Sequence, residues 1–146
     1  MTIRIFPTAQ DAENAFYEAL ERADLEAMMS VWAEDEEIVC VHPSGPRLTG
    51  QDQVRESWRR IFSGAAGARV QVSLQAQTSG VMFAVHSVLE SFAVQGQAQP
   101  AAVVATNVYL RTPAGWRLLA HHASPAPQRA RDPSQPAARE TPKILH

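Results

Sequence analysis

The amino-acid sequence predicts an α+β fold, with three helices in the first half of the chain and an antiparallel sheet in the second. Apolar residues recur every three or four positions over residues 8–22, 24–32 and 50–62, which indicates helices with one buried face. After residue 68, β-branched and aromatic stretches alternate with turn residues, which is typical of strands joined by hairpins. A curved sheet folded over the helices would leave a cavity at its open end.

Each predicted helix has a start signal. Thr8 and Asp11 have the spacing of a capping box at the start of the first helix, over residues 8–22. Asp24 is placed to cap a short second helix. Thr49 and Asp52 repeat the capping-box spacing before a third helix. The apolar stripe of the third helix comprises Val54, Trp58, Ile61 and Phe62.

The most informative segment lies between the second and third helices, over residues 38–50. It begins with an apolar strand, Ile38 to Val41, and His42-Pro43-Ser44-Gly45 forms a rigid turn after it. An imidazole at the end of such a strand can point into a cavity. Four further strands are predicted over residues 69–76, 81–94, 101–111 and 116–124.

Size and composition restrict the possible functions. The chain has 146 residues, of which 45% are hydrophobic and 19% charged, and this suits one globular domain. A net charge of −2 provides no basic surface, so we expect no nucleic-acid partner. No apolar run is long enough to span a membrane and the start of the chain lacks a signal peptide, which predicts a cytoplasmic protein.

Cys40 is the only cysteine, which excludes an intramolecular disulfide and a site built from several thiolates. Its place in an apolar strand favours a buried small side chain. A nucleophilic role stays open, because His42, two residues further on, would share the same face of the strand.

Residues 125–146 differ from the rest of the chain, because proline recurs along them and basic residues outnumber acidic ones. Repeated proline is incompatible with helices and interior strands, so we expect an extended tail after a single domain over residues 1–124. The apolar end of the tail, Ile144-Leu145, could dock on a neighbouring subunit, although a loose tail is the simpler interpretation.

Several motifs along the chain carry a family resemblance: Ala23-Asp24-Leu25, Trp32, His42-Pro43-Ser44-Gly45, Gly50, Trp58, Gly115-Trp116-Arg117 and His121-His122-Ala123-Ser124. In this order, over about residues 8–125, they resemble the nuclear transport factor 2 superfamily, in its SnoaL-like and ketosteroid-isomerase-like branch. The resemblance implies a cone-shaped α+β domain that forms a homodimer through the convex face of its sheet. It also implies an apolar pocket inside the cone, and we expect no cofactor.

Ketosteroid isomerases offer a comparison residue by residue. Their general base is the Asp of a D-P-x-G turn, and His42 stands at that position here. Phe16 corresponds to their oxyanion-hole Tyr, and Asn107 to the neutral Asp on a late strand. Trp58 corresponds to a pocket aromatic residue on the third helix. The resemblance therefore implies a retained pocket in which His42 and Asn107 face an apolar chamber, and it argues against steroid isomerisation.

His42 and Asn107 are the candidate catalytic residues. An imidazole with an ordinary pKa of about 6.5 can act as a base at neutral pH. An amide within an apolar strand needs a partner, which a substrate carbonyl would supply. A structural role is the alternative for each: His42 would bond the turn backbone, and Asn107 a neighbouring side chain or water.

Strand alternation assigns further candidates. Tyr109 shares the face of Asn107, where it would serve in packing or in recognition. Arg117 is expected to face outward, which turns His122 into the pocket and His121 toward the dimer side. A slip of one residue would exchange the two histidines.

The family resemblance turns Ser87 into the pocket and leaves His86 and Glu90 on the outer face, as interface or surface residues. A pair of His42 and His122 without a clear third ligand does not indicate a metal site. The candidate substrate-binding residues are Phe16, Trp58, Phe62, Ser87, Tyr109 and His122.

Three functions are compatible with the sequence. In the first, the protein is an isomerase, cyclase, dehydratase or hydratase of a small apolar carbonyl compound, with His42 as general acid or base. In the second, it is a non-catalytic domain that binds a small apolar ligand. In the third, it is a dimerisation module whose pocket is filled by side chains.

Overall fold

The computed structural model describes residues 4–64, 69–93, 96 and 98–127. It contains three helices, α1 (Ala9–Arg22), α2 (Leu25–Val31) and α3 (Gly50–Gly64). Its strands are β1 (Val39–Val41), β2 (Arg47–Thr49), β3 (Arg69–Ser79), β4 (Phe83–Ala93), β5 (Ala101–Thr112) and β6 (Gly115–Pro125). The predicted α+β fold, with helices first and most of the sheet after them, is confirmed.

The six strands form one sheet in the order β2-β1-β6-β5-β4-β3. Four neighbouring pairs are antiparallel, whereas β1 runs parallel to the last strand, β6. The expectation of a purely antiparallel sheet was therefore wrong at this one pair. Its consequence is that the end of β1, with His42 after it, lies beside His122 of β6.

Side-chain caps define the starts of the first two helices, as the sequence predicted. The Thr8 hydroxyl accepts a hydrogen bond from Asp11 N at 3.0 Å, and Asp24 Oδ1 accepts one from Ala27 N at 3.0 Å. Ala23 ends α1 in the left-handed region, at φ 52°, which turns the chain directly into α2. At the start of α3, the side chain of Gln53 reaches back and accepts from Thr49 N.

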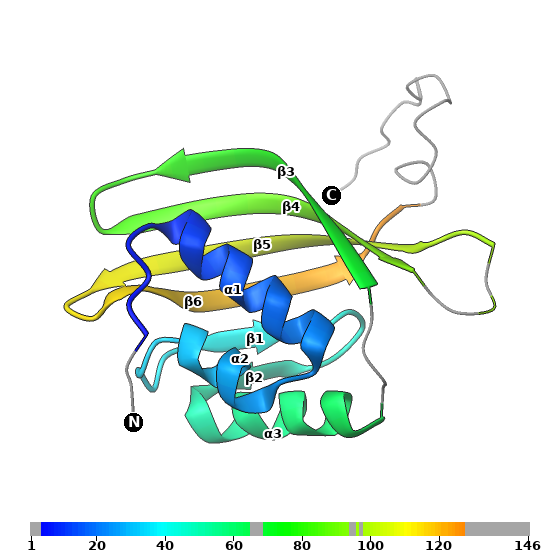
Figure 1. The fold of residues 1–146 in the computed structure, drawn as a ribbon, viewed down its shortest axis with the longest axis horizontal. Coiled ribbons are helices and arrows are strands. Elements are labelled where there is room, and N and C mark those ends of the chain that lie inside the picture. The colour runs from blue at the N-terminus through cyan, green and yellow to red at the C-terminus, as the bar shows by residue number, and fades with distance from the viewer. Residues whose placement is uncertain (1–3, 65–68, 94–95, 97, 128–146) are drawn as a thin grey trace.

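The core lies between the helices and one face of the sheet. Helix α1 contacts β3, β5, β6 and α2, and Figure 1 shows it in front of β5 and β6. Phe16 and Trp32 are buried at this junction, with their rings in edge contact. Helix α3 packs against α2 and the β1–β2 hairpin, so the hairpin and its turn are positioned by helix packing.

A β-bulge in β6 reverses the expected faces of two histidines. Val108 pairs with Ala120 while Tyr109 pairs with Leu118, so Leu119 is an extra residue in β6. Leu118 and His121 therefore both face the core, although they are three positions apart. The prediction that His122 faces inward was wrong, because strand alternation was counted across a bulge: His121 is buried and His122 is exposed.

The orientation predicted for β4 was also wrong. His86 and Glu90 are each 2% exposed and face the core, whereas Ser87 and Val85 are exposed on the other face of the sheet. Arg117 was expected to face outward but is 7% exposed. Its guanidinium donates a hydrogen bond to Arg4 O and stacks on the buried Phe6 ring. Glu90 and Arg117 are buried with hydrogen-bond partners and His86 is buried beside Glu13, an arrangement that amphipathic patterning does not anticipate.

The expected boundary between domain and tail falls at the end of β6. Pro125 is the last residue of this strand, and Ala126 N still donates to Ala102 O at 2.9 Å. The rest of the predicted tail, residues 128–146, lies outside the described residues. Within the described part of the chain, no helix is long and apolar enough to cross a membrane.

Candidate functional site

A cavity of about 190 Å³ opens at one end of the sheet. The C-terminal ends of α1 and α3 meet there with the turn after β1 and the end of β4, at the right of Figure 1. Its wall is mainly apolar, and three polar side chains interrupt it. The lining residues are Leu20, Ala23, His42, Pro43, Trp58, Ile61, Phe62, Glu90, Phe92 and His121.

The volume of the cavity limits the size of the ligand that it can hold. An apolar protein cavity of about 150 Å³ is large enough to bind benzene. Drug-sized ligands occupy pockets of about 300 Å³ or more. At about 190 Å³, this cavity suits a compound with one ring and a few substituents.

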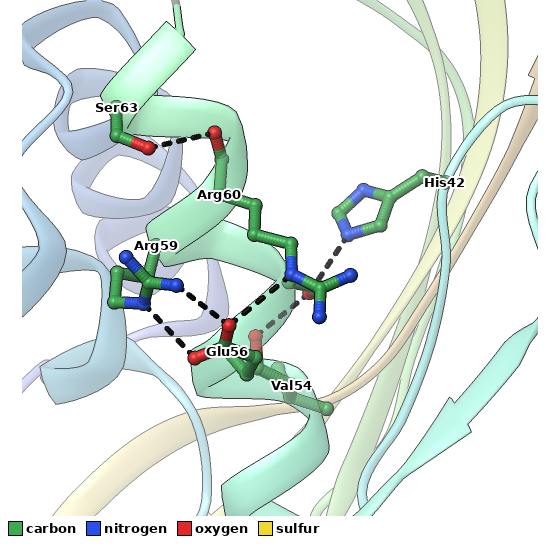
Figure 2. Close-up of polar contacts among 7 residues, drawn as sticks. His42, Val54, Glu56, Arg59, Arg60 and Ser63 are labelled. Carbon is green, nitrogen blue, oxygen red and sulfur yellow. Dashed lines mark hydrogen bonds and ion pairs between the residues drawn. The ribbon is translucent and has the colours of Figure 1, made fainter.

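His42 extends from the end of β1 toward α3 (Figure 2). Its Nε2 lies 3.0 Å from Ser57 Oγ, and the Ser57 hydroxyl donates to Val54 O at 2.8 Å. The imidazole meets Trp58 edge-on, with ring centres 4.7 Å apart. Partial burial lowers the pKa of His42 below its ordinary value, so the ring is neutral at pH 7.

Cys40 is fully buried behind His42, with its sulfur 3.6 Å from His42 Nε2. Burial raises the pKa of its thiol to about 12, so the nucleophilic thiolate is not formed near neutral pH. Of the two interpretations of Cys40, the structure therefore favours a buried small side chain.

Glu90 is the acidic group of the cavity wall. Its Oε2 accepts a hydrogen bond from the Tyr17 hydroxyl of α1 at 2.5 Å. Burial raises the pKa of Glu90 from 4.5 to about 7, the Tyr17 bond opposes this shift, and the nearby charge of Glu13 adds to it. The carboxyl is thus poised between its acid and base forms at neutral pH, as a general acid–base catalyst requires.

His121 forms the floor of the cavity. Its ring lies against Phe16 and Trp58, with centres 5.0 and 6.4 Å away, and its Nδ1 is 2.6 Å from Asn107 Oδ1. Burial is the main cause that lowers the pKa of His121 to about 3, and the neighbouring imidazoles of His42 and His122 add to it. His121 is therefore neutral at every physiological pH.

Asn107 connects the floor of the cavity to α1. Its amide nitrogen donates to Tyr17 OH at 3.0 Å and to Glu13 Oε2 at 3.2 Å, while its oxygen lies against His121. Both N–H groups of this buried amide and one lone pair of its oxygen are occupied by protein groups. It holds Tyr17 and His121 in place and presents no free donor to a ligand.

The network continues away from the cavity. Tyr109 OH donates to Glu13 Oε2 at 2.7 Å. His86 Nδ1 lies 3.1 Å from the same oxygen without making a hydrogen bond. The result is a buried polar layer between α1 and β4–β6, in which Glu13 and Tyr17 supply the helix side.

The predicted site residues separate into three groups. His42, Trp58 and Phe62 line the cavity. Phe16, Asn107 and Tyr109 are fully buried beneath it, where they contact the lining residues or the polar layer. Ser87 and His122 lie on the opposite face of the sheet, so the prediction that they face the pocket was wrong.

Sequence reasoning missed Glu90 and His121 as pocket residues. A signal was present in the polar pairs Glu13/Tyr17 on α1 and His86/Glu90 on β4, each spaced four residues apart. Polar residues on the buried stripe of a helix indicate polar partners on the strands that it covers.

Among the described residues, no group of three His, Cys, Asp or Glu side chains is arranged to hold a metal ion. Charged pairs near the site lie on the outside of α3, where Glu56 binds Arg59 and Arg60 (Figure 2). The hydrogen bond from Arg59 is the main cause that lowers the pKa of Glu56 to about 2. These exposed pairs contribute to the surface of the helix and not to the cavity.

Solved structures share this fold. The chain is 38% identical to a domain from Thiobacillus denitrificans described as a calcium/calmodulin-dependent protein kinase type II association domain, over 85% of this chain and 99% of that one, with a TM-score of 0.81. It is 31% identical to an NTF2-like protein from Streptomyces avermitilis described as a dehydratase, over 79% and 91%, with a TM-score of 0.70. A ketosteroid isomerase-like protein from Erwinia carotovora shares the fold at 19% identity, covering 81% and 94%, with a TM-score of 0.67.

No match is found among curated proteins. The family model for the SnoaL-like domain matches residues 10–128, a range that includes α1 from its second residue onward, the other two described helices, the six described strands and the residues that line the cavity. The sequence resemblance is thus confirmed, and the chain belongs to the SnoaL-like branch of the NTF2-like superfamily.

Proposed function

We propose that the protein binds a small, one-ring carbonyl compound in the cavity and moves a proton on it, as an isomerase or dehydratase does. The observation that supports this most strongly is the buried Glu90 carboxyl in the wall of an apolar cavity, where burial raises its pKa. The description of the Streptomyces avermitilis relative as a dehydratase is in keeping with such chemistry.

In the proposed reaction, Glu90 is the general acid. Because its Oε2 accepts from Tyr17, the proton of the acid form is carried by Oε1, which donates it to the carbonyl oxygen. Neutral His42 is the general base, and its Nδ1 takes a proton from the carbon next to the carbonyl. The product is an enol, and the isomerisation is complete when His42 returns its proton to another carbon of the ligand and the Glu90 carboxylate takes back the proton of the enol oxygen.

Asn107 has a different role in this proposal from the one that the sequence suggested. Both N–H groups of its amide are bonded to α1, so it cannot also donate to a developing oxyanion. It is a positioning residue, which fixes Tyr17 and through it the orientation of Glu90. His42 keeps its predicted role, and Glu90 joins it.

The test follows solvent deuterium entering cyclohexanone by proton NMR in D₂O at neutral pD. The protein is expected to accelerate exchange next to the carbonyl, and Glu90→Gln and His42→Gln to reduce the acceleration by about a hundredfold or more. Glu18→Gln, at an exposed position of α1, is the matched control and should leave the rate unchanged. Binding without acceleration, or acceleration that survives both substitutions, would refute proton transfer by these residues.

A non-catalytic association role is the second candidate. It is favoured by the Thiobacillus denitrificans relative, which is described as an association domain. The outer face of the sheet, opposite the helices, also exposes Val85 and Val104, each 37% exposed, and Phe83, 51% exposed. We expect a homodimer of cone-shaped subunits through this face, and Val104→Lys should convert it to a monomer in light scattering. Dimerisation with no bound ligand and no exchange would favour association alone.

A further inference from the structure

We propose that the cavity selects a ligand that donates a hydrogen bond, namely a one-ring carbonyl compound that also carries a hydroxyl group. Both imidazoles in the wall are held by the protein in the tautomer that offers a lone pair to the cavity. This inference rests on the proposed function, because it concerns the same cavity, and it names the substrate class more narrowly.

The tautomer of His121 follows from Asn107. The Asn107 amide nitrogen faces Tyr17 and Glu13, which fixes its oxygen toward His121 Nδ1 at 2.6 Å. A carbonyl oxygen only accepts hydrogen bonds, so Nδ1 of His121 carries the proton. The remaining ring nitrogen, Nε2, then has a lone pair, and it is the only nitrogen of this residue left for a ligand.

The tautomer of His42 follows from Ser57. The single hydroxyl proton of Ser57 is used in the bond to Val54 O, so its oxygen accepts from His42 Nε2 at 3.0 Å. Nε2 therefore carries the proton, and Nδ1 has the lone pair. No described residue makes a hydrogen bond to His42 Nδ1 or to His121 Nε2, so the two lone pairs are left for water or a ligand.

The other polar groups of the cavity do not remove the need for a hydrogen-bond donor on the ligand. Glu90 is an acceptor in its ionised form and donates only when protonated, and no Lys or Arg is among the described residues that line the cavity. The indole N–H of Trp58 is a donor without a partner among the described residues, but this nitrogen is itself buried. At a pH at which Glu90 is ionised, the accessible polar side-chain atoms of the described lining residues are thus all acceptors.

A ligand without a hydrogen-bond donor would displace the water bound to these lone pairs and form no hydrogen bond to them in its place. Burying an acceptor unpaired lowers affinity by about tenfold or more relative to a matched ligand that donates to it. A hydroxyl group supplies such a donor, while the carbonyl oxygen accepts the proton of Glu90 when that group is protonated. A hydroxy ketone satisfies both requirements, and a simple ketone satisfies one.

Nitrogen-15 NMR of the imidazole rings tests the tautomers directly, at pH 7 and without any ligand. We expect His42 with its proton on Nε2 and His121 with its proton on Nδ1. Ser57→Ala should release the His42 ring to exchange between tautomers. The matched control is Ser63→Ala, because Ser63 lies on the same helix and its hydroxyl makes the same kind of bond, to Arg60 O at 3.1 Å (Figure 2). The opposite tautomer at either ring would overturn the inference.

Affinity for a matched set of ketones tests the specificity. The probes are cyclohexanone, the hydroxycyclohexanone isomers and the corresponding methoxycyclohexanones, titrated by NMR above pH 8 with the full-length protein. At least one hydroxy isomer should bind about tenfold more tightly than cyclohexanone and than its own methyl ether. Ser57→Ala should reduce this preference, and Ser63→Ala should preserve it.

The possible outcomes separate this inference from the proposed function. Equal binding of cyclohexanone and all hydroxy isomers overturns the donor requirement and leaves the proposed function standing. Binding by no ketone at millimolar concentration overturns both. A preference for hydroxy isomers that survives Ser57→Ala would show that Ser57 does not set it, and would refute the role assigned to the His42 tautomer.

Discussion

Replacing Glu90 by Gln should make the protein more stable at alkaline pH. Burial raises the pKa of Glu90 from 4.5 to about 7, so the folded state holds this proton over a range in which the unfolded chain has lost it. For an acid with a raised pKa, the stability is complete below pH 4.5 and is lost as the pH rises through 7. Gln carries no charge, and its carbonyl oxygen can still accept a hydrogen bond from the Tyr17 hydroxyl.

The size of this stability difference follows from the pKa shift of Glu90. Each pKa unit corresponds to about 1.4 kcal/mol, so a rise from 4.5 to about 7 corresponds to about 3 kcal/mol. The free energy of unfolding of Glu90→Gln minus that of the wild type should therefore increase by about 3 kcal/mol between about pH 4 and about pH 8. The side chain is 2% exposed, so solvent screening reduces this value little.

Urea unfolding at several pH values, followed by tryptophan fluorescence, measures the difference. Taking the difference between variant and wild type removes the contribution of titrating groups that do not interact with Glu90. The groups that face Glu90 are Tyr17 and Glu13 on α1 and the two cavity histidines, His42 and His121. Glu18→Gln, at an exposed position on α1, is the control and should give a flat difference. A flat difference for Glu90→Gln would refute the idea that burial holds this carboxyl in its acid form.

Three other substitutions test the fold and the polar layer. Gly115→Ala should destabilise by about 3 kcal/mol in urea unfolding, because φ is +98° and a Cβ would lie 2.8 Å from Phe6 N; a loss below about 1 kcal/mol would contradict this contact. Asn107→Leu should lower stability by about 3 kcal/mol, since it leaves buried groups of Tyr17 and His121 unpaired, and an unchanged melting temperature would count against the network. The pKa of His121 falls from 6.5 to about 3 on folding, so the stability that it contributes is lost as the pH falls below 6.5. His121→Leu should remove this part of the acid sensitivity, which urea unfolding at about pH 4 and about pH 7 would detect.

The sequence predicted the helices well because their signals are local. Thr8 and Asp24 cap the helices that follow them, and the strand before His42 ends where expected. The parallel pairing of β1 with β6 was not predictable in the same way, since it joins segments far apart in the chain.

The faces of β4 and β6 were mispredicted for physical reasons. On β4 the family resemblance placed Val85, Ser87 and Leu89 inside, whereas the structure buries the alternate set, which includes His86 and Glu90. The polar set is buried because α1 supplies partners from distant positions. On β6, the bulge at Leu119 leaves no composition signal, and it exchanges the positions of His121 and His122.

Carbon-13 NMR of the glutamate side-chain carboxyls, titrated with pH, tests the central claim most directly. The signal that disappears in Glu90→Gln should have its midpoint near pH 7, well above those of the exposed carboxyls. A hydroxycyclohexanone that binds in the cavity should shift this midpoint and leave the other carboxyl signals in place. Titration of the Glu90 carboxyl at its ordinary pKa of 4.5 would contradict the proposal that an acid–base group stands in the wall of the cavity.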